Sequence, residues 1–291
     1  MDNQPKIAFV GFGEAAQAFV SGWDLADPSR IAAYDIKTDD PAARQAMRER
    51  YRMLGVRGCD ALADALAGAA IVFSVVTADR ALEAAAAAAP LLGAGAFWLD
   101  CNSCAPGTKQ RAAEAIDARG ARYVDVAVMA PVHPKRHLVP LLVSGPHARE
   151  AADALRALGM KPVIAGPAVG EASSIKMIRS VMVKGIEALT AECFLAARRA
   201  GVEAQVIASL DASDPAMQWR RRGAYNLERM MVHGARRAAE MREVAATVEA
   251  LGLAGRMSAA AAQWQADIAA LHAEPGDDDF SSRAERILSR L

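Results

Sequence analysis

The segment that most constrains the fold is residues 6–16, where a short apolar run passes into small residues and then into a helix-like stretch. Residues 6–10 are typical of a buried strand, and Gly11, Gly13 and Ala16 follow in the pattern Gly-x-Gly-x-x-Ala. The first glycine permits a tight turn, the second lets the backbone approach a pyrophosphate, and the alanine lets the helix pack on the strand. The segment therefore predicts a dinucleotide-binding unit, with phosphates held at a helix N-terminus.

A carboxylate at the expected distance supports this prediction. A second apolar run, residues 30–34, ends at Asp35, 22 residues after Gly13, and a ribose-binding acid is expected about 20 residues after the glycines. The charge of Asp35 favours NAD, because it would repel the 2′-phosphate of NADP. Lys37 and Arg44 lie nearby in the sequence and could bind that phosphate, so NADP stays an alternative.

Composition excludes several classes of function. The 291 residues contain 34 Lys and Arg and 34 Asp and Glu, so no overall basic field attracts nucleic acid or an anionic membrane. No secretory signal and no apolar run of about 18 residues is present, which predicts a cytoplasmic protein. Cys101 and Cys104 form a CxxC pair without a second pair of ligands, so no metal is expected.

Strand-like and helix-like segments alternate through the first part of the chain and give way to helical segments alone. The strand-like runs after Asp35 are residues 70–76, 96–100, 122–128, 141–144 and 162–165. This order predicts an α/β fold, a Rossmann-like doubly wound and mostly parallel sheet, followed by an all-α C-terminal domain. We place the domains at residues 1–167 and 168–291. Ligands should bind beyond the carboxyl ends of the strands, near Val76 and Thr77.

The expected long helix over residues 173–200 carries a polar cluster. Lys176 has Ser173 at i−3, Arg179 at i+3 and Ser180 at i+4, so the four share one helix face. A lysine on a helix usually faces solvent, so only the arrangement of its neighbours argues for chemistry.

At this point the chain resembles the β-hydroxyacid dehydrogenases, which include 3-hydroxyisobutyrate and 6-phosphogluconate dehydrogenases. The resemblance covers nearly the whole sequence and is carried by residues 11–16, by the loop Asp-Val-Ala-Val-Met-Ala-Pro at 125–131, and by the segment 170–180. It implies that Lys176 is the catalytic lysine and that Asn102 and Ser103 contact substrate or nicotinamide. It also implies a homodimer.

Two parts of the chain depart from that family's pattern. The substrate loop usually reads Asp-Ala-Pro-Val-Ser-Gly-Gly, and its last three positions are here Met129, Ala130 and Pro131. The asparagine after the lysine is also replaced, by Arg179 and Ser180. Because an arginine can bind a carboxylate through two parallel hydrogen bonds, an acidic substrate is still expected.

The C-terminal part is similar to a less characterised branch of the superfamily with its own C-terminal domain. His233 stands where the family has a second lysine. Arg236 and Arg237 follow at i+3 and i+4, so the three could line a pocket or form a solvated basic helix face. Both interpretations stay open at this point.

Together these patterns predict an NAD(P)-dependent oxidoreductase that transfers a hydride between nicotinamide and a β-hydroxyacid-type alcohol, with Lys176 as general acid/base. An imine reductase and a noncatalytic nicotinamide-binding protein are the alternatives. The expected cofactor residues are Gly11, Phe12, Gly13, Glu14, Ala15, Asp35, Lys37, Val76, Thr77 and Asn102. The expected substrate residues are Asn102, Ser103, Met129, Ala130, Pro131, Arg179, Ser180 and His233.

Overall fold

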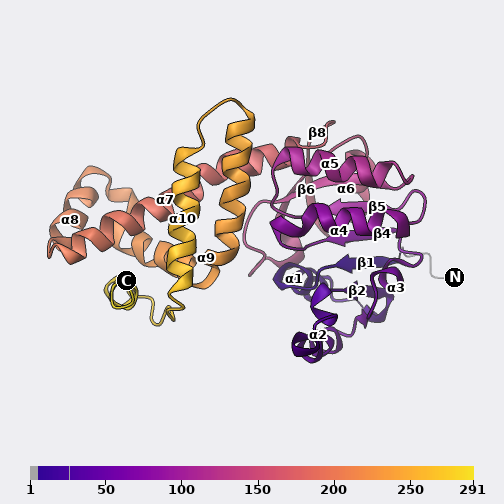
Figure 1. Ribbon diagram of the computed structural model, residues 1–291, viewed down its shortest axis with the longest axis horizontal. Coiled ribbons are helices and arrows are strands. Elements are labelled where there is room, and N and C mark those ends of the chain that lie inside the picture. The colour runs from indigo at the N-terminus through magenta and orange to yellow at the C-terminus, as the bar shows by residue number, and fades with distance from the viewer. Residues whose placement is uncertain (1–5, 26) are drawn as a thin grey trace. The chain divides into compact units, whose positions relative to one another are not determined.

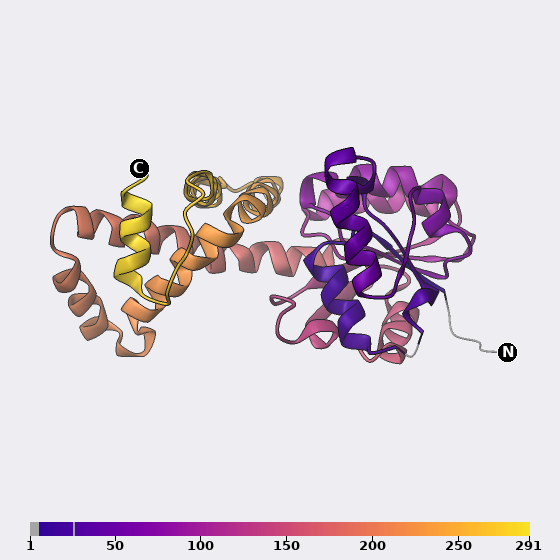
Figure 2. The same cartoon turned by 90° about the horizontal axis from the view of Figure 1, so that it is seen from below.

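The computed structural model describes residues 6–25 and 27–291 and divides into two compact units (Figures 1 and 2). The first unit extends to Lys176 and the second begins at Met177. The sequence places the boundary earlier, between residues 167 and 168. The units divide later because the first turns of helix α7 (Glu171–Arg199) contact the sheet through Asp125, whose carboxylate accepts hydrogen bonds from the Gly170 and Ser173 amides.

The first unit is built on one eight-stranded sheet. Its strand order is β3-β2-β1-β4-β5-β6-β7-β8, and every neighbouring pair is parallel except β6 and β7. The doubly wound, mostly parallel sheet is therefore confirmed. The strands are β1 (Ile7–Val10), β2 (Ile31–Tyr34), β3 (Arg57–Gly58), β4 (Ile71–Ser74), β5 (Phe97–Asp100), β6 (Arg122–Val128), β7 (Pro140–Ser144) and β8 (Lys161–Gly166). The two-residue edge strand β3 has no apolar run, so the sequence pattern missed it.

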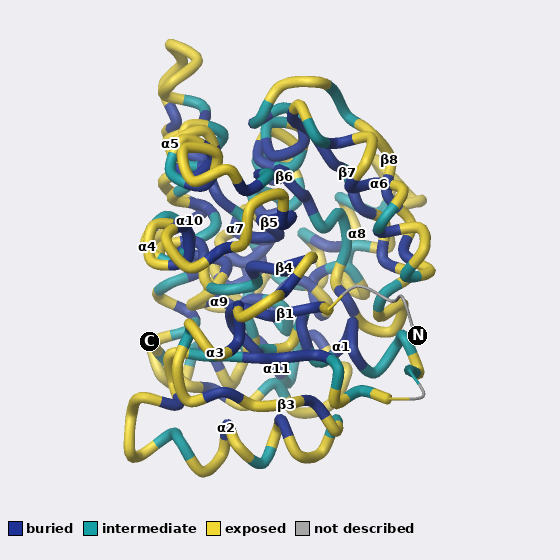
Figure 3. The backbone as a smooth tube through the Cα atoms, turned by 90° about the vertical axis from the view of Figure 1, so that its right-hand side faces the viewer, coloured by how far each residue is buried: buried dark blue, intermediate teal, exposed yellow. Residues whose placement is uncertain are grey.

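Helices cover both faces of this sheet, and the central strands are buried (Figure 3). Successive residues of β1 point to opposite faces of the sheet. Phe9 lies in the core on one face, together with Phe19 of α1. Ala8 lies in the core on the other face, together with Ala85 of α4. The helices are α1 (Glu14–Trp23), α2 (Pro41–Met53), α3 (Leu62–Leu66), α4 (Ala81–Ala88), α5 (Pro106–Asp117) and α6 (Ala148–Ala157).

The second unit contains only helices among its described elements, as the sequence predicted. After α7 come α8 (Glu203–Ser213), α9 (Trp219–Ala250), α10 (Arg256–Ala270) and α11 (Phe280–Leu288). Phe194, Leu227 and Ile268 lie in their shared core. None of the described helices is both long enough and apolar enough to cross a lipid bilayer.

Candidate functional site

The turn after β1 requires a glycine at position 11. Gly11 has a φ of +86°, and a Cβ there would lie 2.7 Å from the Val75 carbonyl oxygen and 3.0 Å from Val76 Cγ1. Its amide donates to the Tyr34 carbonyl at 2.8 Å. The turn therefore passes tightly between the ends of β2 and β4, with Val76 beside it and the exposed Thr77 next in the chain.

Gly13, in contrast, has open space beside it. It is the N-cap of α1 with a φ of −82°, which other residues adopt easily. Apart from its own neighbours in the chain, no described atom lies within 4 Å of the position a Cβ would take. The fold itself therefore does not need a glycine here, whereas a phosphate approaching the N–H groups of α1 would need that space.

The residues around Gly13 divide between core and surface. The Phe12 ring is fully buried, 6.1 Å from the ring of Phe9 and 5.1 Å from that of Tyr51. The Phe12 side chain is thus part of the core and is not available to a ligand. Glu14 is exposed in the first turn of α1, and Ala15 packs against the core.

Asp35 directly follows β2 and faces the glycine turn. Its Oδ2 accepts a hydrogen bond from the Phe12 amide at 2.7 Å, and its Oδ1 accepts one from the Lys37 amide at 3.0 Å. Each carboxylate oxygen has a second lone pair, so Asp35 can also accept from ribose hydroxyls.

Lys37 and Arg44, the two cations near Asp35 in the sequence, differ in exposure and in hydrogen bonding. The Lys37 side chain is exposed. Arg44 donates from Nε to the Thr38 carbonyl at 2.7 Å and from Nη2 to the Asp39 carbonyl at 3.2 Å. The Arg44 guanidinium is therefore occupied by hydrogen bonds to backbone carbonyls, which leaves it poorly placed to hold a 2′-phosphate.

At the carboxyl end of β5 the structure brings together two residues that lie far apart in the sequence. Lys176 on α7 donates from Nζ to Ser103 Oγ at 2.6 Å, across 73 residues. Both side chains are partly buried. An amine and a hydroxyl at this edge of the sheet can pass a proton to and from a bound alcohol.

Asn102, beside Ser103, is almost completely buried, with 3% of its surface exposed. Its Nδ2 donates to Ser74 Oγ at 2.9 Å and to Asp100 Oδ1 at 2.7 Å. Its Oδ1 has no hydrogen-bond partner among the described residues. A buried acceptor without a partner is costly, so Asn102 is suited to accept a hydrogen bond from a ligand.

Lys109 on α5, which the sequence patterns did not single out, lies beneath this loop. Its side chain is fully buried and makes ion pairs with Asp100 at 2.9 Å and with Asp125 at 3.4 Å. One sequence signal pointed to this cluster, since Asp100 and Asp125 are acids within otherwise apolar runs that form neighbouring strands.

The cysteines of the CxxC pair form no disulfide and are both buried. Burial raises the pKa of the Cys101 thiol to about 12, and the positive charges of Lys109 and Lys176 only partly oppose this. Cys101 is thus a neutral thiol near pH 7 and a poor nucleophile. The described residues contain no cluster of three or more side chains suited to a metal ion.

The altered part of the substrate loop, residues 129–131, directly follows the end of β6. The Met129 amide donates to the Pro140 carbonyl at 2.9 Å, Ala130 packs against the core, and Pro131 is exposed. Only part of this loop is therefore open to a ligand.

The residues expected to share one face of α7 differ in exposure. Ser173 and Ser180 are buried, Lys176 is partly buried, and Arg179 is exposed. Ser173 has a clear structural role, because its hydroxyl donates to Asp125 Oδ2 at 2.9 Å.

The basic segment of α9 is not a uniform solvated face. Arg237 is buried in an ion pair with Glu187 of α7, with Nε 3.0 Å from Oε2. Arg236 is exposed, 3.9 Å from Glu240, and His233 is partly buried. Arg237 therefore joins two helices of the second unit, and its guanidinium is already occupied.

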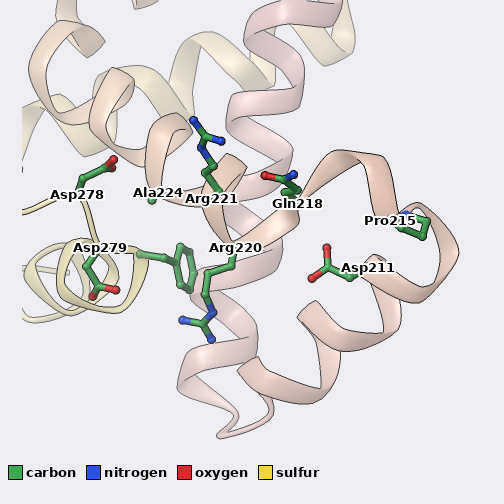
Figure 4. A pocket seen from close by; sticks show the side chains of 9 residues that line it. Asp211, Pro215, Gln218, Arg220, Arg221, Ala224, Asp278 and Asp279 are labelled. Atoms are coloured by element: carbon green, nitrogen blue, oxygen red, sulfur yellow. The ribbon is translucent and has the colours of Figure 1, made fainter.

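A cavity of about 550 Å³ lies elsewhere, within the second unit (Figure 4). Arg220 and Arg221 line it and point away from each other. The Arg220 guanidinium donates to Glu203 at 3.2 Å, and Asp211 accepts from the Trp219 amide at 2.9 Å. None of the residues expected to bind substrate or cofactor lines this cavity.

Two family models match the chain. Residues 6–185 match the NAD-binding domain of 6-phosphogluconate dehydrogenase. Residues 197–268 match a domain of unknown function. The matches agree with the prediction of a dehydrogenase-like first domain and a distinct C-terminal domain.

Solved structures of the same fold include proteins of known and unknown function. A conserved hypothetical protein from Sinorhizobium meliloti is 42% identical, over 100% of this chain and 98% of its own, with a TM-score of 0.75. A conserved protein of unknown function, described as similar to 3-hydroxyacid dehydrogenases, is 28% identical over 91% and 98%, with a TM-score of 0.67. The 3-hydroxyisobutyrate dehydrogenase of Mycobacterium tuberculosis shares the fold, at 18% identity over 97% and 98% and a TM-score of 0.72.

Proposed function

The chain belongs to the family of the NAD-binding domain of 6-phosphogluconate dehydrogenase, and on this basis we propose that it is an NAD(P)-dependent oxidoreductase acting on a β-hydroxyacid-type alcohol. The observation that carries the proposal is the 2.6 Å hydrogen bond between Lys176 Nζ and Ser103 Oγ. It supports the proposal because the carboxyl end of the sheet is the edge where this class of fold binds ligands, so the Lys176 amine would be available there for proton transfer.

The residues around the glycine turn fit a dinucleotide. The open space beside Gly13 suits the pyrophosphate, and Asp35 suits the ribose hydroxyls of NAD. When bound, the nicotinamide accepts or supplies the hydride.

The chain's own side chains would handle the proton. Lys176 accepts the proton of the substrate hydroxyl as the carbon is oxidised, and returns it in the opposite direction. Ser103 orients the Lys176 amine through their hydrogen bond. The unpartnered Asn102 Oδ1 accepts a hydrogen bond from the ligand.

An acidic substrate is part of the proposal. Arg179 is exposed and carries a permanent positive charge suited to a carboxylate. Ser180, His233 and the loop residues Met129, Ala130 and Pro131 are the further candidates to shape the substrate site.

The direct test is a panel of β-hydroxyacids, simple alcohols and imines, each followed by nicotinamide absorbance with NAD and with NADP. We expect oxidation of one or more β-hydroxyacids. Reduction of imines alone, or cofactor binding without turnover of any compound, would contradict the proposal.

Cofactor preference gives a separate prediction. We propose that NAD is preferred, because Asp35 would repel the 2′-phosphate and Arg44 is bonded to backbone carbonyls. Replacing Asp35→Ser should shift the ratio of NADP to NAD affinity upward by roughly 10–100-fold, since opposed like charges cost up to several kcal/mol. Fluorescence titration of both reduced cofactors measures this ratio.

The matched control is Asp60→Ser, which removes an exposed carboxylate paired with Arg48. This variant should keep the preference of the wild type. Much tighter binding of NADPH than NADH by the unaltered protein would refute the role given to Asp35.

The homodimer stays a prediction. Ile178, Met182 and Leu189 lie exposed along α7, and they provide an apolar surface that a second copy could cover. A monomeric mass from light scattering would contradict it.

A further inference from the structure

Lys109 is a charged residue in an unusual place. It lies on α5 with its side chain fully buried, and lysine side chains are rarely fully buried in proteins. Its Nζ donates to the Asp100 carbonyl oxygen at 2.6 Å and to Asp100 Oδ1 at 2.9 Å, and it lies 3.4 Å from Asp125 Oδ1. Burial alone would lower the pKa of this amine, but the two carboxylates outweigh it and raise the pKa above its ordinary value. Lys109 is therefore a buried ammonium that joins two strands.

On one side, Asp125 fixes the start of α7. Its Oδ2 accepts from the Gly170 amide at 3.2 Å, from the Ser173 amide at 2.9 Å and from the Ser173 hydroxyl at 2.9 Å. These bonds satisfy amides that the helix leaves unpaired, at the end where its dipole favours an anion. Lys176 lies only one turn beyond Ser173.

On the other side, Asp100 fixes the loop after β5. Its Oδ1 accepts from the Asn102 amide at 3.0 Å and from Asn102 Nδ2 at 2.7 Å. Its Oδ2 accepts from the Tyr123 hydroxyl at 2.7 Å. Ser103 is the next residue of this loop.

We propose that Lys109 is a positioning residue that holds the Ser103 loop and the first turn of α7 at the separation where Lys176 reaches Ser103. The ammonium pairs with both carboxylates, and each carboxylate holds one of the two segments. The consequence for turnover rests on the proposed function, whereas the consequence for the two segments does not.

The activity test compares Lys109→Met with Arg111→Met, an exposed residue on the same helix. Lys109→Met should lower kcat by about 10²-fold, the effect of a misplacement near 1 Å. Its affinity for NADH should fall much less than kcat, because the glycine turn and Asp35 lie outside the network and only Asn102 lies within it. Arg111→Met should behave as the wild type. An unchanged kcat for Lys109→Met would overturn the proposal.

Removing the ammonium leaves two buried carboxylates uncompensated and endangers folding. The double variant Lys109→Met/Asp100→Asn removes one positive and one negative charge, so it keeps the net charge of the cluster. Its kcat is measured in the same way as that of Lys109→Met. Asp125→Asn is a third protein for this measurement. It keeps an acceptor for the α7 amides but loses the carboxylate paired with Lys109, so its kcat should fall as in Lys109→Met. A wild-type kcat for Asp125→Asn would overturn the proposal.

Amide hydrogen exchange tests positioning without any turnover. In the double variant, exchange should quicken in residues 100–105 and 170–176, with residues 7–16 as the internal reference. Unchanged exchange, or an equal rise in all three segments, would overturn the positioning role. If the wild type oxidises no compound of the panel, the proposed function fails, and the exchange result still decides the role of Lys109.

Discussion

Replacing Lys176 by Met is expected to lower kcat by about 10²–10⁴-fold, the range that general acid/base catalysis contributes. Methionine keeps much of the length of the side chain but cannot accept or return the substrate proton. Because the glycine turn and Asp35 are unaffected, the affinity for NADH should stay that of the wild type. Steady-state kinetics and fluorescence titration of NADH measure the two effects separately.

The control for this variant is Lys161→Met, which removes an exposed lysine at the edge strand β8. It should keep the full rate. A Ser103→Ala variant should fall between the two, since it removes the hydrogen-bond partner of Lys176 and leaves the amine. A Lys176→Met protein with undiminished turnover would remove Lys176 from the mechanism.

The two glycines of the fingerprint should respond to alanine in opposite ways. Gly13→Ala is expected to leave the melting temperature unchanged and to weaken NADH binding by roughly tenfold or more, or about 1.4 kcal/mol. The reason is that its Cβ meets only open space in the fold but occupies the expected place of a phosphate.

Gly11→Ala is expected to destabilise the fold itself by at least about 1–2 kcal/mol, the cost of a left-handed conformation for a residue with a Cβ. The contact with the Val75 carbonyl oxygen, at 2.7 Å, adds to this cost. Thermal unfolding and NADH titration of both variants test the pair. If Gly13→Ala binds NADH as tightly as the wild type, the pyrophosphate does not lie where we place it.

Much of the fold could be predicted because its signals are local. Buried strands appear as short apolar runs, and helices end shortly before residues such as Gly201 and Gly252, which have positive φ. The tight turn at Gly11 and the position of Asp35 beside it were also predictable, because the glycine pattern and its distance from the acid are local in the sequence. The exception is β3, whose two exposed residues carry no pattern.

The side-chain partners within the candidate site were less predictable. The spacing of Arg237 from His233 was compatible both with a pocket and with a solvated helix face. In the structure Arg237 has neither place, because it is buried in an ion pair with Glu187. Helical spacing says which residues share a face, but it does not say what packs on that face. For the same reason, the sequence pattern did not distinguish the buried Lys109 from a solvent-exposed lysine of a charged helix.

The sequence by itself therefore determined the order of the helices and of the strands other than β3, the tight turn at Gly11 and the NAD-binding class of the first domain, because each depends on residues close together in the chain. Only the tertiary structure decided that Lys176 meets Ser103 and that Lys109 lies buried between Asp100 and Asp125. These contacts join α5, β5, β6 and α7, and they form only when the strands pair and the helices pack on the sheet.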